Sequence, residues 1–173
     1  KYFYEGSSGL RMTLTKFVAA KEPLEFFNIE VTNSGAKPRE LEMKSFVKWA
    51  LGERYPASDF ETTTDFDSGR GAIFAENPDA LKPGSVAFHA IVGDGTPGQK
   101  NDLFSLPEDP SFSGLDSRLR VAPGETKRVS YALGMAANKT EAERLVDKYR
   151  RVADVDAEFD TTMRGINRYL DVI

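Results

Sequence analysis

The sequence contains no cysteine and one histidine, and each scarcity excludes a kind of chemistry. Without cysteine the chain can form no disulfide, iron–sulfur cluster or thiolate zinc site. The same absence favours a reducing compartment, so we expect a cytoplasmic location. The lone histidine, His89, has no second imidazole with which to share a metal, and it follows Phe88 in a predicted strand. We therefore interpret His89 as structural.

Long apolar runs and blocks of basic residues are also missing. No stretch approaches the roughly 20 apolar residues that a membrane helix needs, and the N-terminus lacks the apolar segment of a signal peptide. The net charge is −4, and lysine and arginine are interspersed with acidic residues. We expect neither a membrane segment nor a nucleic-acid partner. A length of 173 residues with 40% hydrophobic content is sufficient for one sizeable core.

Motifs of catalysis and ligand binding are either absent or match in residue type without the structural context that they require. Residues 93–98 spell G-x-G-x-x-G, but Pro97 interrupts the helix that a dinucleotide site requires, so we predict a surface turn. No serine lies in a G-x-S-x-G elbow. We assign no catalytic residue and no cofactor-binding residue to this chain.

A calcium loop is the one metal motif whose letters partly match. Asp65, Asp67 and Glu76 occupy its first, third and twelfth places. Gly69 stands where a carboxylate ligand belongs, and Arg70 stands where the loop requires glycine. We predict a hairpin turn here and assign no metal ligand.

Apolar residues alternate with a period of two from residue 10 to about residue 134, between turns rich in Gly, Pro, Asn and Asp. This pattern predicts an antiparallel β-sandwich. We expect a hairpin at residues 33–35, because apolar residues continue on one parity from Leu41 to Leu51. Further strands are predicted at residues 60–66, 72–75, 86–92 and 129–133, with a turn at 123–125. Residues 93–118 are predicted to form a long surface loop.

Trp49 is the residue whose chemistry best suits a sugar, because an indole can stack on a pyranose ring. Its parity argues against this role, since it shares a face with Met43 and Val47. We expect Trp49 to lie in the core. The pairs Tyr2 with Tyr4 and Phe26 with Phe27 remain open as stacking platforms.

The period changes to that of helices at Asn138. Thr140 with Glu143 matches a capping box, and Asp154 is a candidate cap for a second helix. The second helix carries an apolar stripe that the sandwich or another unit must cover: Val155, Phe159, Met163, Ile166 and Leu170. We expect a sandwich segment over residues 1–137 and linker helices over 138–173. Both ends break off inside a pattern, as in a piece of something larger.

Several segments together resemble glycoside hydrolase family 94, formerly glycosyltransferase family 36. Residues 22–33, 38–41 and 46–52 read EPLEFFNIEVTN, PREL and FVKWALG, and ENP, VAF, GLD and APGE follow in the family's order. The family includes cellobiose phosphorylases, oligoglucan phosphorylases and the phosphorylase-like part of cyclic β-1,2-glucan synthases. Two departures are visible. The family's sandwich begins with strands that have no counterpart here, and the stretch around residues 114–117 is shorter than in β-1,2-glucan members.

The resemblance implies phosphorolysis of a β-glucoside oligosaccharide, with inorganic phosphate as co-substrate. In the family the catalytic acid and the phosphate site lie on an (α/α)₆ barrel, which would begin after residue 173. We therefore carry over no catalytic residue and do not expect this chain alone to be an enzyme. The implied role is to pack on the barrel, to help form a homodimer and to lend a loop to the active-site rim.

Two other classes of protein remain as alternatives. A free-standing carbohydrate-binding module would use exposed aromatic residues, and an immunoglobulin-like interaction domain would use edges or loops. Neither class accounts for two amphipathic helices after the last strand.

Overall fold

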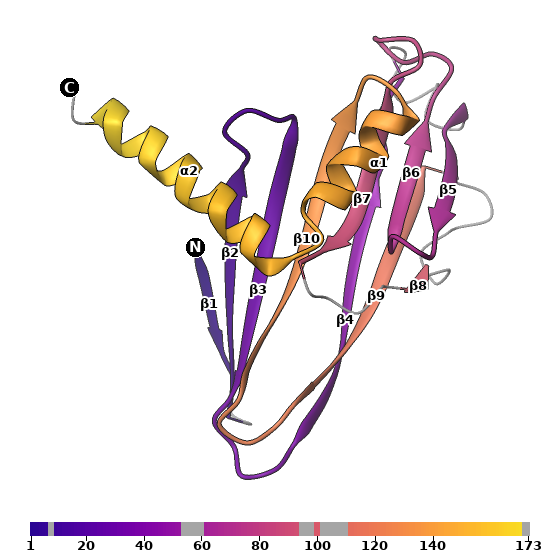
Figure 1. The fold of residues 1–173 in the computed structure, drawn as a ribbon. Coiled ribbons are helices and arrows are strands. Elements are labelled where there is room, and N and C mark those ends of the chain that lie inside the picture. The colour runs from indigo at the N-terminus through magenta and orange to yellow at the C-terminus, as the bar shows by residue number, and fades with distance from the viewer. Residues whose placement is uncertain (7–8, 53–60, 94–98, 101–110, 171–173) are drawn as a thin grey trace.

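The computed structural model describes residues 1–6, 9–52, 61–93, 99–100 and 111–170. In this part of the chain, two antiparallel sheets pack face to face and two helices follow them (Figure 1). The seven-stranded sheet has the order β1-β2-β3-β10-β7-β6-β5, and the three-stranded sheet has the order β4-β9-β8. The elements are β1 (Tyr2–Glu5), β2 (Leu10–Val18), β3 (Leu24–Asn33), β4 (Arg39–Lys48), β5 (Thr63–Asp67), β6 (Ala72–Glu76), β7 (Val86–Val92), β8 (Gln99–Lys100), β9 (Phe112–Val121), β10 (Thr126–Ala136), α1 (Lys139–Lys148) and α2 (Val152–Leu170).

The predicted fold class, an antiparallel β-sandwich with two C-terminal helices, is confirmed. The predicted strand at residues 86–92 coincides with β7, which is buried along its whole length. None of the helices in the described ranges is long and apolar enough to cross a membrane.

The predicted loop at residues 93–118 is wrong over its last part, because β9 begins at Phe112. This strand pairs with all ten residues of β4. Its inward positions include Ser113 and Ser117, which bond the buried polar groups of Trp49 and Tyr131. Because serines replace apolar residues on the buried face, the alternation that predicts a strand is weak here.

The predicted hairpin at residues 33–35 is also wrong. β3 pairs with β2 and β10, whereas β4 pairs with β9 in the other sheet. The chain therefore crosses between the sheets after Asn33, and it crosses back in the turn between β9 and β10. Figure 1 shows both connections at the same end of the sandwich. The parity of β4 was predicted correctly, but parity alone does not identify a strand's partner.

Asn33 joins the two connections. Its backbone N–H donates to Glu125 O (3.0 Å) and its carbonyl accepts from Gly124 N (2.7 Å). Its side-chain Nδ2 donates to Lys37 O (2.8 Å) and to Val121 O (3.0 Å), and Oδ1 accepts from Gly35 N (3.0 Å). The residue is buried. One asparagine thus satisfies backbone groups of both turns.

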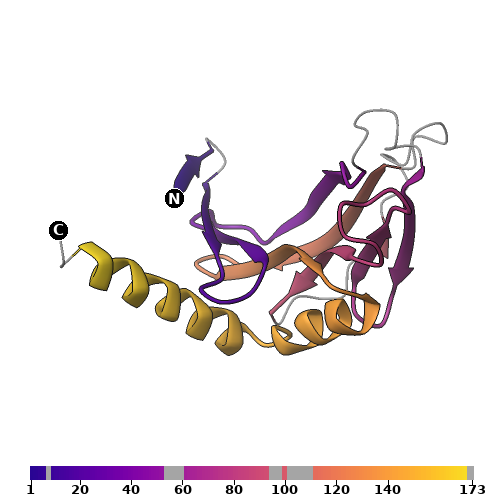
Figure 2. The same ribbon diagram turned by 90° about the horizontal axis from the view of Figure 1, so that it is seen from above.

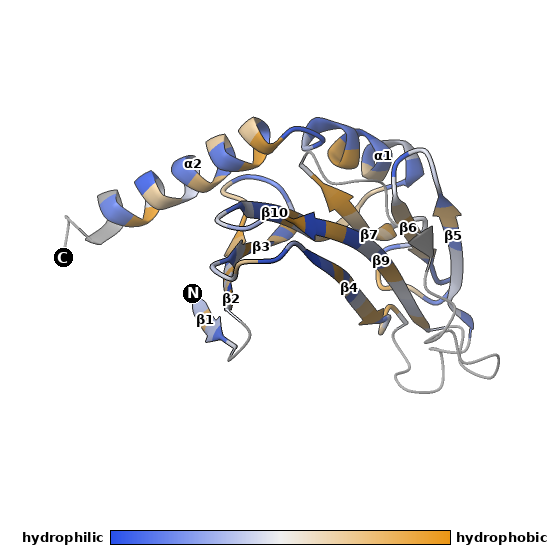
Figure 3. Ribbon diagram, turned by 90° about the horizontal axis from the view of Figure 1, so that it is seen from below, coloured by the Kyte–Doolittle hydropathy of each residue, from blue (hydrophilic) through white to orange (hydrophobic). Residues whose placement is uncertain are grey.

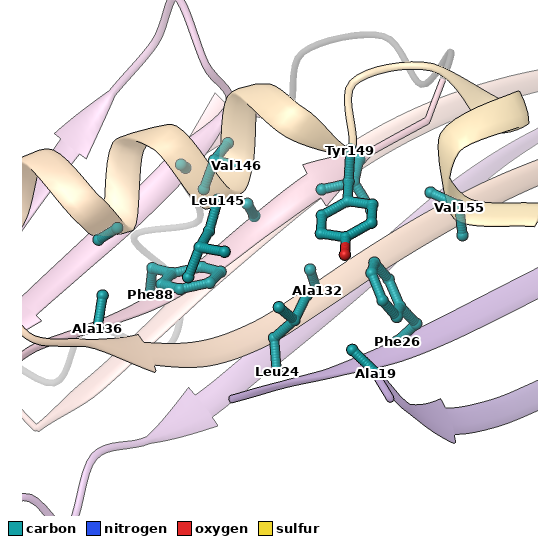
Figure 4. Packing of buried hydrophobic residues seen from close by; sticks show 14 of the residues in the cluster. Ala19, Leu24, Phe26, Phe88, Ala132, Ala136, Leu145, Val146, Tyr149 and Val155 are labelled. Atoms are coloured by element: carbon teal, nitrogen blue, oxygen red, sulfur yellow. The ribbon is translucent and has the colours of Figure 1, made fainter. Parts of the chain in front are cut away.

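Both faces of the large sheet are covered. The small sheet covers the inner face, where Ile73, Ile91, Leu115 and Tyr131 pack together. On the outer face, α1 and the start of α2 lie across the large sheet (Figure 3). Their apolar side chains pack on those of the central strands, including Phe26, Phe88 and Ala132 (Figure 4). The central strands therefore need apolar residues on both parities, as in β6 and β7.

Gly134 lies on the outer face near the end of β10, between Leu24 of β3 and Phe88 of β7. A Cβ atom at this position would lie 2.6 Å from Phe88 Cζ and 2.8 Å from Leu24 Cβ. The Phe88 ring therefore occupies the space that a side chain would need.

We expect Gly134→Ala to lower the free energy of unfolding by about 1 to 3 kcal/mol, the usual cost of overpacking a core. The measurement is urea denaturation followed by circular dichroism. Gly165→Ala is the matched control, because nothing lies within 4 Å of a Cβ built at Gly165 in α2. Alanine should be neutral or slightly stabilising there. Equal effects at the two positions would contradict the packing described for Gly134.

Both predicted helix caps need correction. The N-cap of α1 is Asn138, whose side chain accepts from Glu141 N at 2.9 Å, so the capping box of Thr140 and Glu143 is wrong. Asp154 is the third residue of α2, and its carboxylate binds the side chain of Arg151. The acid still lies near the positive end of the helix dipole. For α1, Asn138 and Thr140 both have side chains that suit an N-cap, and the helix begins after the earlier one.

Candidate functional site

The helices dock on the large sheet through Tyr149, the residue after α1. Its ring is buried and makes an edge contact with Phe26 of β3, with centroids 4.9 Å apart (Figure 4). Its hydroxyl donates to Glu22 Oε2 at 2.6 Å and lies 3.0 Å from Glu158 Oε2. Glu22 precedes β3, and Glu158 belongs to α2. Tyr149 therefore connects the sheet with both helices.

The two carboxylates are held by further groups. Glu22 Oε1 accepts from Lys148 Nζ at 2.9 Å, and Glu158 Oε1 accepts from Ala20 N at 2.8 Å. Partial burial raises the pKa of Glu22, but hydrogen bonds from Tyr149 and Lys148 outweigh it, so this pKa lies below its ordinary value. Burial and the two carboxylates raise the pKa of Tyr149. The phenol therefore stays protonated and serves as a donor.

A second set of ion pairs fixes α1 to the turn between β5 and β6. Arg70 donates to Asp67 Oδ2 at 2.7 Å and binds both carboxylate oxygens of Asp147 in α1. Arg150 donates to Gly69 O at 2.6 Å. These bonds and the Tyr149 cluster both hold the C-terminal end of α1.

The calcium-loop letters are part of this hairpin, whose strands pair from Asp67 with Ala72 onwards, as predicted. Asp67 binds Arg70, Asp65 binds Lys139 at 2.8 Å, and Glu76 lies opposite Thr63 at the far end of the hairpin. Their carboxylates therefore do not converge. Within the described ranges, no three His, Asp or Glu side chains are placed to hold a metal ion.

His89 lies between the two sheets, 2% exposed. Its Nε2 lies 2.9 Å from Ser45 Oγ, and its Nδ1 has no partner in the part of the chain that the structure describes. Burial lowers the pKa of His89 to about 4, so the ring is neutral at ordinary pH. This position in the core agrees with the structural interpretation of His89. The Ser45 contact has no signal in the sequence, because 44 residues separate the pair.

The aromatic residues singled out from the sequence lie in different environments. Trp49 is buried, and its Nε1 donates to Ser113 Oγ at 2.7 Å, so its predicted core position is confirmed. Phe26 is buried under Tyr149, which excludes it as a platform. Tyr2 and Tyr4 on β1 are exposed. Of the G-x-G-x-x-G letters, residues 94–98 lie outside the described residues, and Gly93 N–H donates to Tyr149 O at 2.8 Å.

The stripe on α2 is covered only in its first half. Val155 is buried, and Phe159 makes an edge contact with Phe17 of β2, with centroids 5.1 Å apart. Beyond this contact α2 extends past the sheet (Figures 1 and 2). Met163 is 37% exposed and Ile166 is 47% exposed. The side chain of Leu170 lies outside the described residues. The first half of α2 is therefore fixed to the sheet by Glu158 and Phe159, and its second half is exposed to solvent.

Comparisons with known proteins agree with this architecture. The family model described as glycosyl hydrolase 94, supersandwich domain, matches residues 2–103 and 108–152. No curated protein has a sequence similar enough to count as a relative.

Among solved structures, a polysaccharide lyase is similar with a TM-score of 0.57 at 11% identity, over 83% of this chain and 22% of the lyase. An inferred kojibiose phosphorylase from the human microbiome has a TM-score of 0.48 at 7% identity, over 90% of this chain and 19% of its own. The chain thus spans about a fifth of the length of these proteins. At such identities the lyase shows the fold alone. The family model covers most of the chain, and the chain belongs to the glycosyl hydrolase 94 supersandwich domain family.

Proposed function

We propose that this chain is the non-catalytic supersandwich part of an inverting β-glucoside phosphorylase. The observation that carries the proposal is the free half of α2, where Met163 and Ile166 stay exposed on a helix whose first half is fixed to the sheet. Burying an apolar side chain of this size is worth about 1.5 to 3 kcal/mol, so such a stripe favours a covering unit. The family match supports a catalytic (α/α)₆ barrel as that unit.

The reaction of the parent enzyme would be phosphorolysis. An oxygen of inorganic phosphate bonds to the anomeric carbon, the glycosidic bond breaks, and one carboxylic acid protonates the leaving oxygen. The product is α-glucose 1-phosphate, because the attack inverts the configuration. Phosphate replaces the activated water of an inverting hydrolase. The residues of this chain would orient the barrel and lend a loop to the rim of its active site. The parent enzyme would be a homodimer in the cytoplasm.

A carbohydrate-binding module is the second candidate. The observation that favours it is the run Tyr2, Phe3 and Tyr4 on the edge strand β1, each exposed by 63% or more. Exposed aromatic rings are suitable for stacking on sugars. The docked helices favour the phosphorylase part over the module, because sugar binding alone does not require a fixed helix that extends from the sandwich.

The test of the proposed function has a catalytic and a binding part. We expect the chain alone to release no glucose 1-phosphate from cellobiose or β-1,2-gluco-oligosaccharides in phosphate. We expect it to bind the parent's barrel, added as a separate polypeptide and followed by calorimetry. Met163→Ser with Ile166→Ser should weaken that binding more than tenfold without changing the melting temperature of the chain.

Matched controls separate docking from folding. Asp160→Ser with Arg164→Ser changes polar positions on the same helix and should leave barrel binding unchanged. Phe159→Ser should instead lower the melting temperature, because Phe159 packs on Phe17. Phosphate-dependent turnover by the chain alone, or barrel binding that is insensitive to Met163 and Ile166, would contradict the proposed function. Tight sugar binding that is lost with Tyr2→Ala and Tyr4→Ala would favour the module.

A further inference from the structure

A cavity of about 480 Å³ lies at the end of the sandwich where α1 begins. Its walls come from four segments: the turn between β2 and β3, the connection between β6 and β7, the end of β10 and the first two turns of α1. Figure 1 shows these segments at one end of the sandwich, opposite to the end where the chain crosses between the sheets. The volume lies in the range of small-molecule sites.

Three cations from three of these segments line the cavity: Lys21, Lys82 and Arg144. Arg144 is neutralised within the wall, because its guanidinium binds both carboxylate oxygens of Glu141 at 2.8 and 2.7 Å. Glu22, the other acid of the wall, already accepts from a lysine and a phenol in the Tyr149 cluster. Within the part of the chain that the structure describes, no acid forms an ion pair with Lys21 or Lys82. The cavity therefore carries two uncompensated positive charges.

The deeper part of the cavity is apolar. Pro23, Met135, Ala136 and Leu145 line it, and the last two are only 7% and 2% exposed. Ser85, which is 8% exposed, adds a hydroxyl-bearing side chain to the same wall. A bare inorganic anion would not use the apolar surface, whereas the C–H groups of a sugar ring would contact it. The cavity thus suits a ligand with an anionic group at one end and an apolar face at the other.

We propose that this cavity binds a sugar phosphate, with the phosphate on Lys21 and Lys82 and the C–H groups of the sugar on the apolar lining. Lysine binds phosphate as a point charge. The Glu141 carboxylate and the Ser85 hydroxyl are suitable partners for the sugar hydroxyls. The choice of α-glucose 1-phosphate as ligand rests on the proposed function, whose product it is. The cavity would then be a second site for that product, on the sandwich and separate from the reaction centre on the barrel.

The test begins with calorimetry of the full chain at low ionic strength. α-Glucose 1-phosphate should bind saturably with one site per chain. Glucose and inorganic phosphate should each bind at least tenfold more weakly, because each offers only one of the two groups that the cavity recognises. Added salt should weaken the binding, because it screens the attraction between the phosphate and the lysines.

Two charge variants locate the phosphate contact. Lys21→Gln with Lys82→Gln should weaken binding of α-glucose 1-phosphate at least tenfold without changing the melting temperature, because both side chains are exposed. Lys37→Gln with Lys127→Gln is the matched control. It removes the same charge next to the crossing connections, at the opposite end of the sandwich, and should leave binding unchanged.

Methyl NMR locates the ligand independently of these variants. The chain contains four methionines, Met12, Met43, Met135 and Met163, and Met135 is the one that lines the cavity. Its methyl signal should shift during the titration while those of Met12 and Met43 stay in place.

Four outcomes would overturn the proposal: no binding, equal binding of inorganic phosphate, binding that survives the loss of Lys21 and Lys82, or a Met135 signal that does not move. Binding that is lost with Tyr2→Ala and Tyr4→Ala would place the sugar on β1 and also overturn it. Barrel binding through α2 is measured separately, so a failure of this site leaves the proposed function standing.

Discussion

Trp49→Ala is expected to lower the free energy of unfolding by about 3 to 5 kcal/mol, the usual cost of truncating a large buried aromatic residue. Trp49 is 3% exposed and packs between the sheets with Leu115 and Ile73. Its backbone N–H donates to Ser111 O at 2.7 Å, which places the residue at the end of the β4–β9 pairing. The substitution leaves a cavity at that end, and the Ser113 hydroxyl loses its buried partner.

Trp49→Phe separates the cavity from the hydrogen bond, because phenylalanine retains a ring and loses the Nε1 donor. We expect an intermediate cost of about 1 to 3 kcal/mol. Trp49 is the only tryptophan of the chain, so unfolding must be followed by circular dichroism and not by fluorescence. A Trp49→Ala chain that keeps its stability and loses sugar binding would show that the core position is wrong.

Asn33→Ala is the second substitution for which we expect a large effect, about 2 to 4 kcal/mol. The alanine removes two donors from Lys37 O and Val121 O and one acceptor from Gly35 N, all at a residue with no exposed surface. Each buried polar group left without a partner costs about 1 to 3 kcal/mol, and some relaxation of the two turns offsets part of the sum. Chemical denaturation measures the difference.

Asn28→Ala is the matched control, because Asn28 lies on the same strand and is 7% exposed. Its Oδ1 has no hydrogen-bond partner within the described residues. We expect Asn28→Ala to cost about 1 kcal/mol or less, since no strong side-chain acceptor bond is lost. A cost equal to that of Asn33→Ala would indicate that burial, and not the bonds to the turns, makes Asn33 important.

Features that depend on local order along the chain could be predicted from the sequence. Alternation identified most strands and the buried side of Trp49, because a pleated strand sends successive side chains to opposite faces. The helical stripe was predicted for the same reason. Partners could not be predicted. The sequence does not show that β4 joins the other sheet, since the turn after Asn33 reads the same for a hairpin and for a crossover.

The candidate site could be predicted even less. The contacts of Tyr149 with Glu22 and Glu158 depend on how the helices meet the sheet, which the sequence pattern does not show. The strand β9 was missed because Ser113 and Ser117, which bind Trp49 and Tyr131, stand at inward positions where the alternation requires apolar residues. The family resemblance came from the order of short segments, and the match of the supersandwich model supports it.

The position of β10 has a consequence for how the chain acquires its structure. β10 is the last strand in sequence, yet it lies at the centre of the large sheet, between β3 and β7. Thr32 and Thr126, which it brings together, are 94 residues apart in the chain. Contacts so distant are formed slowly, because a long loop must close before they contribute. During synthesis, β1–β3 and β5–β7 would therefore exist as separate antiparallel units with open inner edges. Chains that end before Thr126 should then aggregate rather than form a smaller sandwich.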